Sequence, residues 1–275
     1  MSIINKINFT KTSLQKAKTQ IQEYANTLTC VTEDFWEEHI AKANIYEITL
    51  LDKNIGIFSI HNINTEEKIT MFYLEKSKIN ISQEIFKRIL DEFKIKTAFV
   101  TTGDELFLSL CMDFHKKVKM QAYFFDGTIK NEVRPAEYGR ECLVEATPDE
   151  LPEINKKTDN FFEDLDMTTQ VLGKQKFSVY KFIVDNTEVG YGVIGRNEFA
   201  TKYWGTGMIA LEQCRKKGVG RSIQIHLAKI CRENGAIPVS GCWYYNELSK
   251  KTTESAGRYT KTRLLYVHFT EEQQN

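Results

Sequence analysis

A glycine loop between an apolar run and a helical pattern is the feature that most constrains this chain. Residues 208–211 read Met-Ile-Ala-Leu, and residues 215–221 read Arg-Lys-Lys-Gly-Val-Gly-Arg. Apolar residues then recur at helical spacing as far as Ile230, so the order predicts a strand, a loop and a helix. Glycines at 218 and 220 let a ligand approach the backbone, and the N–H groups at a helix start suit a pyrophosphate.

The loop differs from the two common nucleotide signatures, because it reads Arg-x-x-Gly-x-Gly. It resembles the loop with which the GCN5-related N-acetyltransferases (the GNAT superfamily) bind the pyrophosphate of acetyl-CoA. The resemblance extends to Asn246, Ser249 and Gly257, which follow the next strand at the family's spacing. It implies an α/β fold with a mixed central sheet and flanking helices, the acyl-CoA N-acyltransferase fold. The alternative is a plain turn with a cationic rim.

The same resemblance implies acetyl-CoA as co-substrate. In the family the fourth strand splays from the fifth, which leaves main-chain groups free for the pantetheine arm and the thioester carbonyl. The implied cofactor-binding residues are Met208, Ile209 and Ala210 on the strand, Arg215, Lys216, Lys217, Gly218, Val219, Gly220 and Arg221 in the loop, and Asn246 and Ser249 beyond it. Asn246 could instead be only an N-cap for the helix that follows.

Length and proline placement predict two domains. The 275 residues exceed a usual single domain, and the polar segment 130–137 contains the first of the four prolines, Pro135. This segment lies between a strand-like aromatic run, 122–125, and the next apolar strand at 142–144. We therefore place a linker at about residues 128–139, between domains of residues 1–130 and 140–275.

The carboxy-terminal half shows the element order of the family. After the predicted loop, Val219, Ile223 and Leu227 share one helical face, and we expect this face to pack on the sheet while Gln224, Lys229 and Arg232 face out. Residues 160–172 read as a second helix or a substrate loop. Strands are predicted at 141–146, 177–184, 189–194, 203–211, 238–243 and 264–269. The family normally adds two strands after Gly257, so the pairing of the last strand stays open.

The amino-terminal half repeats part of this order. A hairpin at 45–60, a strand at 69–74, an amphipathic helix at 81–93, a strand at 97–100, a helix at 104–114 and a strand at 120–125 are predicted. No glycine lies between the strand and the first helix, where residues 75–80 read Glu-Lys-Ser-Lys-Ile-Asn. We interpret this half as a degenerate copy of the fold that does not bind acetyl-CoA; the alternative is an unrelated α/β lid.

The predicted catalytic residues are less constrained than the loop. The family's general acid is often a Tyr seven residues after the Asn, but Thr253 occupies that position. Tyr245, Tyr244 and Tyr259 are possible substitutes, of which Tyr245 is preferred, and departure of an unprotonated thiolate is a further alternative.

The general base is equally open, because no carboxylate lies between residues 203 and 211, where many relatives have a Glu. Glu198 is the preferred candidate. Three carboxylates at Glu163, Asp164 and Asp166 could also serve, or could form only a solvated acidic loop.

Composition excludes few classes. With 37 basic and 37 acidic residues, the charge gives no reason to expect nucleic acid or an anionic membrane as partner. Six cysteines without a Cys-x-x-Cys pair, a start without a signal peptide and the lack of a long apolar run predict a cytoplasmic protein with reduced thiols. The five histidines lack metal-ligand spacing, so we expect no metal.

Two functions fit these patterns. The favoured one is an N-acetyltransferase that moves acetyl from acetyl-CoA to a primary amine by direct attack. The acceptor would be a small molecule or a peptide amine, and the sequence leaves its identity and the oligomeric state open. The other is a non-catalytic acyl-CoA-binding sensor, which the Thr at 253 suggests.

Overall fold

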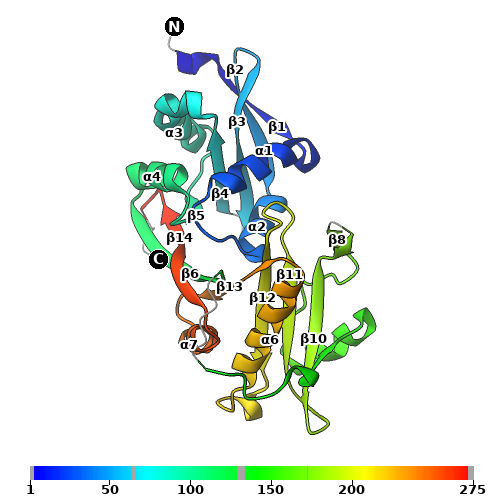
Figure 1. Ribbon diagram of the computed structural model, residues 1–275. Helices are drawn as coiled ribbons and strands as arrows, with labels where there is room; N and C mark the ends of the chain where they lie inside the picture. The colour runs from blue at the N-terminus through cyan, green and yellow to red at the C-terminus, as the bar shows by residue number, and fades with distance from the viewer. Residues whose placement is uncertain (1–2, 64–65, 129–133, 172, 272–275) are drawn as a thin grey trace. The chain divides into compact units, whose positions relative to one another are not determined.

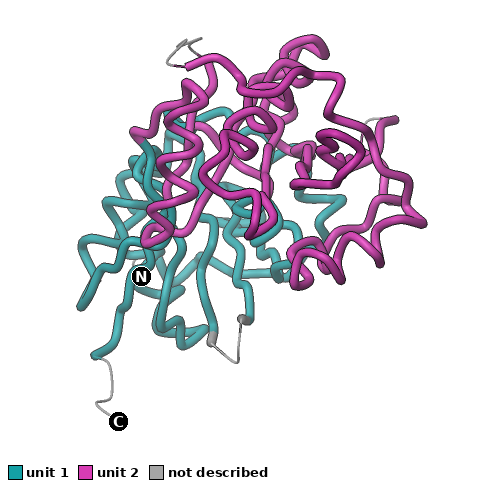
Figure 2. The backbone as a smooth tube through the Cα atoms, turned by 90° about the horizontal axis from the view of Figure 1, so that it is seen from below, with its two compact units in different colours: residues 1–30, 35–122, 262–275 teal, residues 31–34, 123–261 magenta. Residues whose placement is uncertain are grey.

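The computed structural model describes residues 3–63, 66–128, 134–171 and 173–271 (Figure 1). It is an α/β protein with a large mixed sheet and flanking helices, as the sequence predicts. The chain forms two compact units (Figure 2). Unit 1 comprises residues 1–30, 35–122 and 262–275, and unit 2 comprises residues 31–34 and 123–261.

Unit 1 contains a sheet in the order β1-β2-β3-β4-β5-β14, in which β4 and β5 are parallel and the other neighbours are antiparallel. Its core joins strand residues such as Phe58 and Phe72 to Phe86 and Phe107 of the helices. The elements are β1 (Ile7–Thr12), α1 (Leu14–Thr27), α2 (Asp34–Ala41), β2 (Asn44–Leu50), β3 (Lys53–Ile63), β4 (Glu66–Leu74), α3 (Ser82–Glu92), β5 (Thr97–Thr101), α4 (Glu105–Phe114) and β6 (Lys117–Asp126), with 3-10 turns at Ile3–Lys6 and Lys76–Ile81.

Unit 2 contains a sheet in the order β7-β10-β11-β12-β13, in which only β12 and β13 are parallel. Figure 1 shows α6 lying along β11 and β12. The elements are β7 (Leu143–Glu145), α5 (Leu151–Lys157), β8 (Gln170–Val171), β9 (Lys174–Gln175), β10 (Phe177–Val184), β11 (Thr187–Arg196), β12 (Tyr203–Ala210), α6 (Val219–Glu233), β13 (Ile237–Trp243) and α7 (Glu247–Ser255), with 3-10 turns at Arg140–Cys142, Pro148–Glu150 and Glu212–Cys214. The last strand, β14 (Tyr259–His268), begins in unit 2 and belongs to unit 1 from residue 262 onward.

The structure shows how the last strand pairs, which the sequence left open. β14 pairs antiparallel with β5, from Leu264 opposite Thr101 to His268 opposite Thr97. Residues 262–275 therefore belong to unit 1, and a single cut at the predicted linker does not produce the two units. Part of that linker, residues 129–133, lies outside the described residues. A single strand follows α7 in the described part of the chain, where the family normally has two.

α6 packs on the sheet with the face that its sequence predicts. Val219, Ile223 and Leu227 are buried, and β11 offers glycines where they approach: a Cβ on Gly192 would lie only 2.8 Å from Ile223. Lys229 is exposed, but the prediction that Gln224 faces out is wrong, because its side chain is 2% exposed. A buried network, described below, supplies its hydrogen bonds.

Residues 160–172, for which a helix and a loop were both open, form no helix in their described part. Asp159 and Asn160 have positive φ values of 50° and 59°, which end the turn after α5 and bend the chain. Phe162 and Met167 nevertheless join a core cluster with Val179 and Tyr191 on the sheet face opposite α6.

Candidate functional site

β12 and β13 separate into a fork. They pair through three residues only, Tyr203–Gly205 with Ile237–Val239, although β12 continues to Ala210 and β13 to Trp243. On its other edge β12 pairs with β11 along its whole length. The edge of β12 from Thr206 to Ala210 is therefore without a strand partner in unit 2's described residues, and we call this opening the fork.

Main-chain groups of β12 point into the fork. Leu211 donates its N–H to Val189 O at 3.0 Å, and the direction of these groups alternates along an antiparallel strand. Met208 and Ala210 therefore direct their N–H and C=O groups away from β11, toward the fork. Ile209, the third residue of the predicted trio, directs its groups to β11. The bond from Ile237 N–H to Lys202 O, 2.8 Å, agrees with this alternation.

The predicted glycine loop leads into α6 as expected. Gly218 has φ +79°, which favours glycine, and α6 starts at the next residue. The N–H groups of Val219, Gly220 and Arg221 lie in the first helical turn, where no intrahelical acceptor exists. A Cβ on Gly220 would lie 3.0 Å from both Met208 Sδ and Thr252 Cγ2, so only glycine leaves this backbone uncovered.

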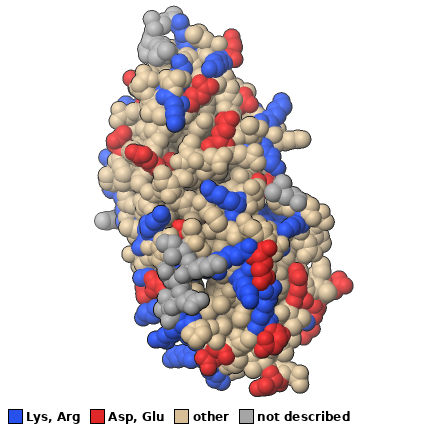
Figure 3. Space-filling model, viewed as in Figure 1, with Lys and Arg blue, Asp and Glu red and all other residues tan. Residues whose placement is uncertain are grey.

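The cations of the loop divide into two groups. Arg215, Lys216 and Lys217 are exposed. Arg221 instead donates from Nε to Pro135 O at 3.0 Å and pairs with Glu137, Nη2 to Oε2, at 3.3 Å. In Figure 3, Lys and Arg side chains gather in the lower left of this face, where Figure 1 draws α7 and the start of α6.

Asn246 and Ser249 lie at the start of α7. Asn246 is the N-cap, and its side chain accepts a hydrogen bond from Ser249 N–H at 3.1 Å. The capping role is therefore present, and a ligand contact by the rest of the exposed amide stays a prediction. Because β12 and β13 are parallel, this residue after β13 lies at the same sheet edge as the loop after β12.

The two predicted catalytic residues lie at opposite ends of the fork. Tyr245 is 63% exposed, with its ring 5.0 Å from that of Trp243 and 5.3 Å from that of Tyr244, at the open end beside Asn246. Glu198 follows β11 at the closed end, just beyond the pairing of Arg196 with Trp204. The structure does not bring these two side chains together.

Sequence reasoning missed a buried arginine at the closed end of the fork. Arg258 is 4% exposed, and its Nη1 donates to Thr206 Oγ1 at 2.6 Å and to Ser240 Oγ at 2.8 Å. Thr206 and Ser240 are the residues of β12 and β13 that directly follow the last paired residues, Gly205 and Val239. Gln224 completes the network: its Oε1 lies 3.1 Å from Thr206 Oγ1, and its main-chain oxygen lies 3.5 Å from Arg258 Nη2.

It also missed two carboxylates on the other face of the sheet. A Cβ on Gly205 would overlap the Asp34 carboxylate, and one on Gly195 would lie 2.5 Å from Asp34 Oδ2. A Cβ on Gly241 would lie 3.0 Å from Glu33 Cδ. Glycines on β11, β12 and β13 thus make room for both acids, and Gly205 is the last paired residue before the fork.

The two faces of the fork are assigned by strand alternation. Trp204 and Met208 pack with α6, so Thr206 and Arg258 lie on the α6 face. Gly205 and Gly241 alternate with Thr206 and Ser240, so Asp34 and Glu33 lie on the opposite face. Asn197 anchors their segment, because its Nδ2 donates to Thr32 O at 3.2 Å and both residues are buried.

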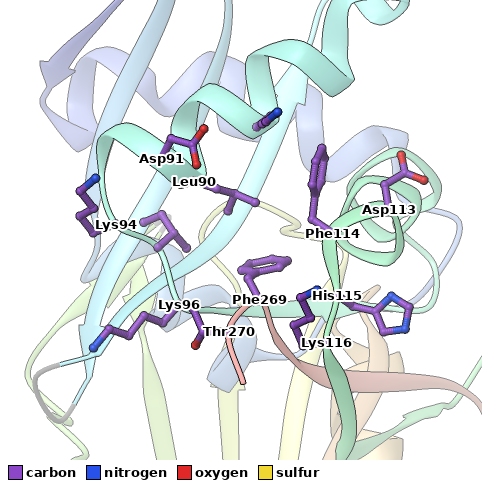
Figure 4. Close-up of a pocket in the computed structure, with 12 residues that line it drawn as sticks. Leu90, Asp91, Lys94, Lys96, Asp113, Phe114, His115, Lys116, Phe269 and Thr270 are labelled. Carbon is purple, nitrogen blue, oxygen red and sulfur yellow. The ribbon is translucent and has the colours of Figure 1, made fainter. Parts of the chain in front are cut away.

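Unit 1 contains a cavity of about 560 Å³ that involves none of the predicted residues. Figure 4 shows it between the ends of α3, α4 and β14. Its charged lining is mixed: Lys87, Lys94, Lys96, Lys116, Asp91 and Asp113.

Two searches of the described residues gave no candidate. No group of three or more His, Cys, Asp or Glu side chains there could hold a metal ion. Helices long and apolar enough to cross a membrane were likewise not found among these residues.

Known proteins with a similar sequence segment or a similar structure are acetyltransferases. Residues 13–128 match a family model described as an acetyltransferase (GNAT) domain. A search of curated proteins found no match. A GNAT-family acetyltransferase from Colwellia psychrerythraea has a similar solved structure, with a TM-score of 0.82, 15% identity, and coverage of 96% of this chain and 100% of that one.

Two further structures share the fold. A tandem GNAT protein from the clavulanic acid biosynthesis pathway gives a TM-score of 0.62 at 12% identity and covers 97% of this chain and 100% of its own. A GCN5-related N-acetyltransferase from Sphaerobacter thermophilus gives 0.61 at 9% identity, with 98% of each chain covered. Residues 13–128 are therefore similar to a GNAT acetyltransferase domain, and the chain has the fold of tandem GNAT proteins. The GNAT fold family uses acyl-CoA.

The family model matches the half that lacks the glycine loop, not the half that contains it. The interpretation of unit 1 as a degenerate copy that does not bind acetyl-CoA therefore stays a prediction.

Proposed function

We propose that this protein transfers an acetyl group from acetyl-CoA to a primary amine, and that unit 2 binds the cofactor. The observation that carries the proposal is the combination of an open β12 edge with a glycine loop at the same edge of the sheet. Neither feature alone would suffice, because a basic glycine turn and a short strand pairing each occur in many folds.

The residues of unit 2 fit the cofactor's chemistry. The free N–H groups of Val219, Gly220 and Arg221 suit the pyrophosphate, with the helix dipole and the three exposed cations of the loop adding positive potential. Met208 and Ala210 would hydrogen-bond the pantetheine arm through their main chains. Asn246 and Ser249 would border the arm at the entrance to the fork.

The acceptor amine would approach from the face opposite α6. The Asp34 carboxylate lies there beside the last paired residue, Gly205, and the Glu33 carboxylate lies beside Gly241. Two acids attract a cationic amine, and one of them can remove its proton before the nitrogen attacks the thioester carbonyl. Asp34 joins Glu198 as a candidate for the base. For the leaving step both predicted alternatives are kept: Tyr245 as the acid, and departure of an unprotonated thiolate. The acceptor would be a small molecule or a peptide amine, and a cytoplasmic location belongs to the same proposal.

A two-stage experiment tests the proposal. Calorimetry should first detect acetyl-CoA binding to the full-length protein. A thiol-release assay across a panel of primary amines, polyamines and peptide amino termini should then detect amine-dependent release of CoA. Binding without release for any amine would favour the non-catalytic sensor, and an absence of binding would overturn the assignment of the fork.

A further inference from the structure

Arg258 places a buried positive charge at the closed end of the fork. Its guanidinium joins the two strands where they separate, through the hydroxyls of Thr206 and Ser240. Its Nε is buried and has no hydrogen-bond partner among the described residues. One donor of this group is therefore unused in a protein that satisfies most of its buried polar atoms.

Within the described part of the chain, no carboxylate is a hydrogen-bond partner of this charge. The acceptors of the Arg258 guanidinium in the described chain are two hydroxyls and the main-chain oxygen of Gln224, all neutral. Burial lowers the pKa of Arg258 to about 10, because a charged guanidinium without a counter-ion is less stable away from water. Bridging two strands does not require a charge, since a neutral amide could donate to the same hydroxyls at a lower desolvation cost.

The position of Arg258 matches the place where negative charge would develop in the proposed reaction. A cofactor whose pyrophosphate lies at the loop extends its pantetheine arm along β12 from Ala210 toward Thr206, about 13 Å of strand. Its sulfur end then approaches the closed end of the fork. The carboxylates of Asp34 and Glu33 lie on the opposite face, so positive and negative groups are separated by the plane of the sheet.

We propose that Arg258 stabilises the CoA thiolate that leaves in the transfer, in place of a general acid; this inference rests on the proposed function. The amine nitrogen forms a bond to the carbonyl carbon, the carbon–sulfur bond breaks, and sulfur keeps the electron pair as a thiolate beside the guanidinium. The ammonium group of the adduct passes its proton to whichever of the two carboxylates on the opposite face, Asp34 or Glu33, is still ionised. No protonated tyrosine is needed, which accounts for a catalytic site with Thr at 253.

The titratable and charged groups that act on Arg258 come from α6. They are the Cys231 thiol, whose pKa burial raises to about 11, and the Arg232 guanidinium. Arg232 provides a matched control, because it donates to Gly127 O at 3.0 Å and, among the described residues, makes no hydrogen bond to either strand of the fork.

The test measures the ionisation of bound CoA rather than turnover. Free CoA is added to the full-length protein, and thiolate absorbance is followed as a function of pH. The bound thiol should ionise about 1–3 pH units below the free thiol, because an unscreened cation lies within a few ångströms. Arg258→Met should remove this difference, and Arg232→Met should preserve it. An equal ionisation of bound and free CoA in the wild type would overturn the inference.

A second measurement needs no variant and remains decisive if Arg258→Met fails to fold. The affinity of wild-type protein for CoA is compared with that for desulfo-CoA at pH 6 and pH 9. Thiolate stabilisation predicts that the ratio rises between these values, by at most about tenfold for each pH unit of the shift. A constant ratio with both ligands bound contradicts the role of Arg258 alone. Absence of binding by both ligands contradicts the proposed function and this inference with it.

Discussion

Each unit contains a strand fork, and the two forks differ in whether side chains fill them. In unit 1, β4 and β5 pair through Lys68 with Thr97 and Ile69 with Ala98, with no later pair in the described residues. Beyond these pairs Met71 and Phe72 are almost completely buried. In unit 2 the corresponding stretch of β12, residues 207–210, is partly exposed. Both units therefore contain a fork, but side chains fill the fork of unit 1 and leave the fork of unit 2 accessible.

The helix that follows each fork shows the same contrast. Asp104 caps α4 after β5, as Asn246 caps α7 after β13. Asp104 is 5% exposed and accepts a hydrogen bond from Tyr24 Oη at 2.5 Å, whereas Asn246 is exposed. A tyrosine thus covers the cap in unit 1, while the amide in unit 2 is accessible to a ligand.

The turns that precede α6 in unit 2 and α3 in unit 1 also differ. α6 follows a glycine at positive φ, whereas a 3-10 turn, Lys76–Ile81, precedes α3. In that turn Lys78 N–H already bonds to Glu75 O at 2.8 Å. These features support the prediction that unit 1 does not bind acetyl-CoA. A strand fork of this kind can hold a cofactor only where side chains leave it unfilled.

The largest effect should come from Gly220→Glu. A side chain there meets Met208 and Thr252 and adds a negative charge beside the pyrophosphate site, so acetyl-CoA affinity should fall at least about 100-fold. Asn80→Glu introduces the same charge in the exposed turn of unit 1 and should leave affinity unchanged. Calorimetry on both variants checks this, and a loss in Asn80→Glu would move the cofactor site to unit 1.

Asp34→Asn should give the next largest effect. Loss of the proposed base should lower kcat/KM about 10²–10⁴-fold near neutral pH, while acetyl-CoA affinity stays at the wild-type level. Glu198→Gln is the companion variant, since Glu198 is the base that the sequence favours. Steady-state kinetics with a responsive amine distinguishes them: a larger loss in Glu198→Gln would return the role to the sequence-predicted residue.

Burial of Asp104, next to the filled fork of unit 1, predicts that the stability of the protein depends on pH. Burial raises the pKa of Asp104 from its usual 3.8 to about 6. As pH rises, Asp104 loses its proton in the unfolded chain at a lower pH than in the native protein. Ionised Asp104 therefore favours the unfolded chain, and the native state loses about 3 kcal/mol of stability between about pH 4 and pH 6. Urea unfolding of Asp104→Asn, relative to wild type, should remove this loss. A constant difference between the two proteins across that range would show that the pKa is not raised.

Asn246→Ala should have the smallest effect, about 1–3 kcal/mol of acetyl-CoA affinity, because the ligand would lose one hydrogen bond. The same variant removes an N-cap, which should cost about 1 kcal/mol of stability. Ser13→Ala removes the N-cap of α1 in unit 1 and serves as a control for capping alone. Parallel calorimetry and thermal unfolding separate the roles; a lower Tm with unaltered affinity would leave Asn246 as a cap only.

The sequence by itself determined the local parts of the proposed cofactor site. Gly218 and Gly220, the apolar spacing of α6 and the cap at Asn246 all depend on residues a few positions apart, where backbone preference and periodicity carry the information. The family resemblance added the separation of β12 from β13, which the structure contains.

Only the tertiary structure decided which distant residues meet at the fork. Asp34 comes from the first part of the chain, and Arg258 reads in sequence as an ordinary surface cation after a glycine. Gln224, expected to face out, is buried because Thr206 satisfies its side-chain amide, through Oγ1 to Oε1 and through the main-chain oxygen to Nε2. The pairing of β14 with β5 is likewise invisible to periodicity. Local patterns specify which face of an element is apolar, whereas partners distant in sequence are selected by packing, hydrogen bonding and charge in the folded chain.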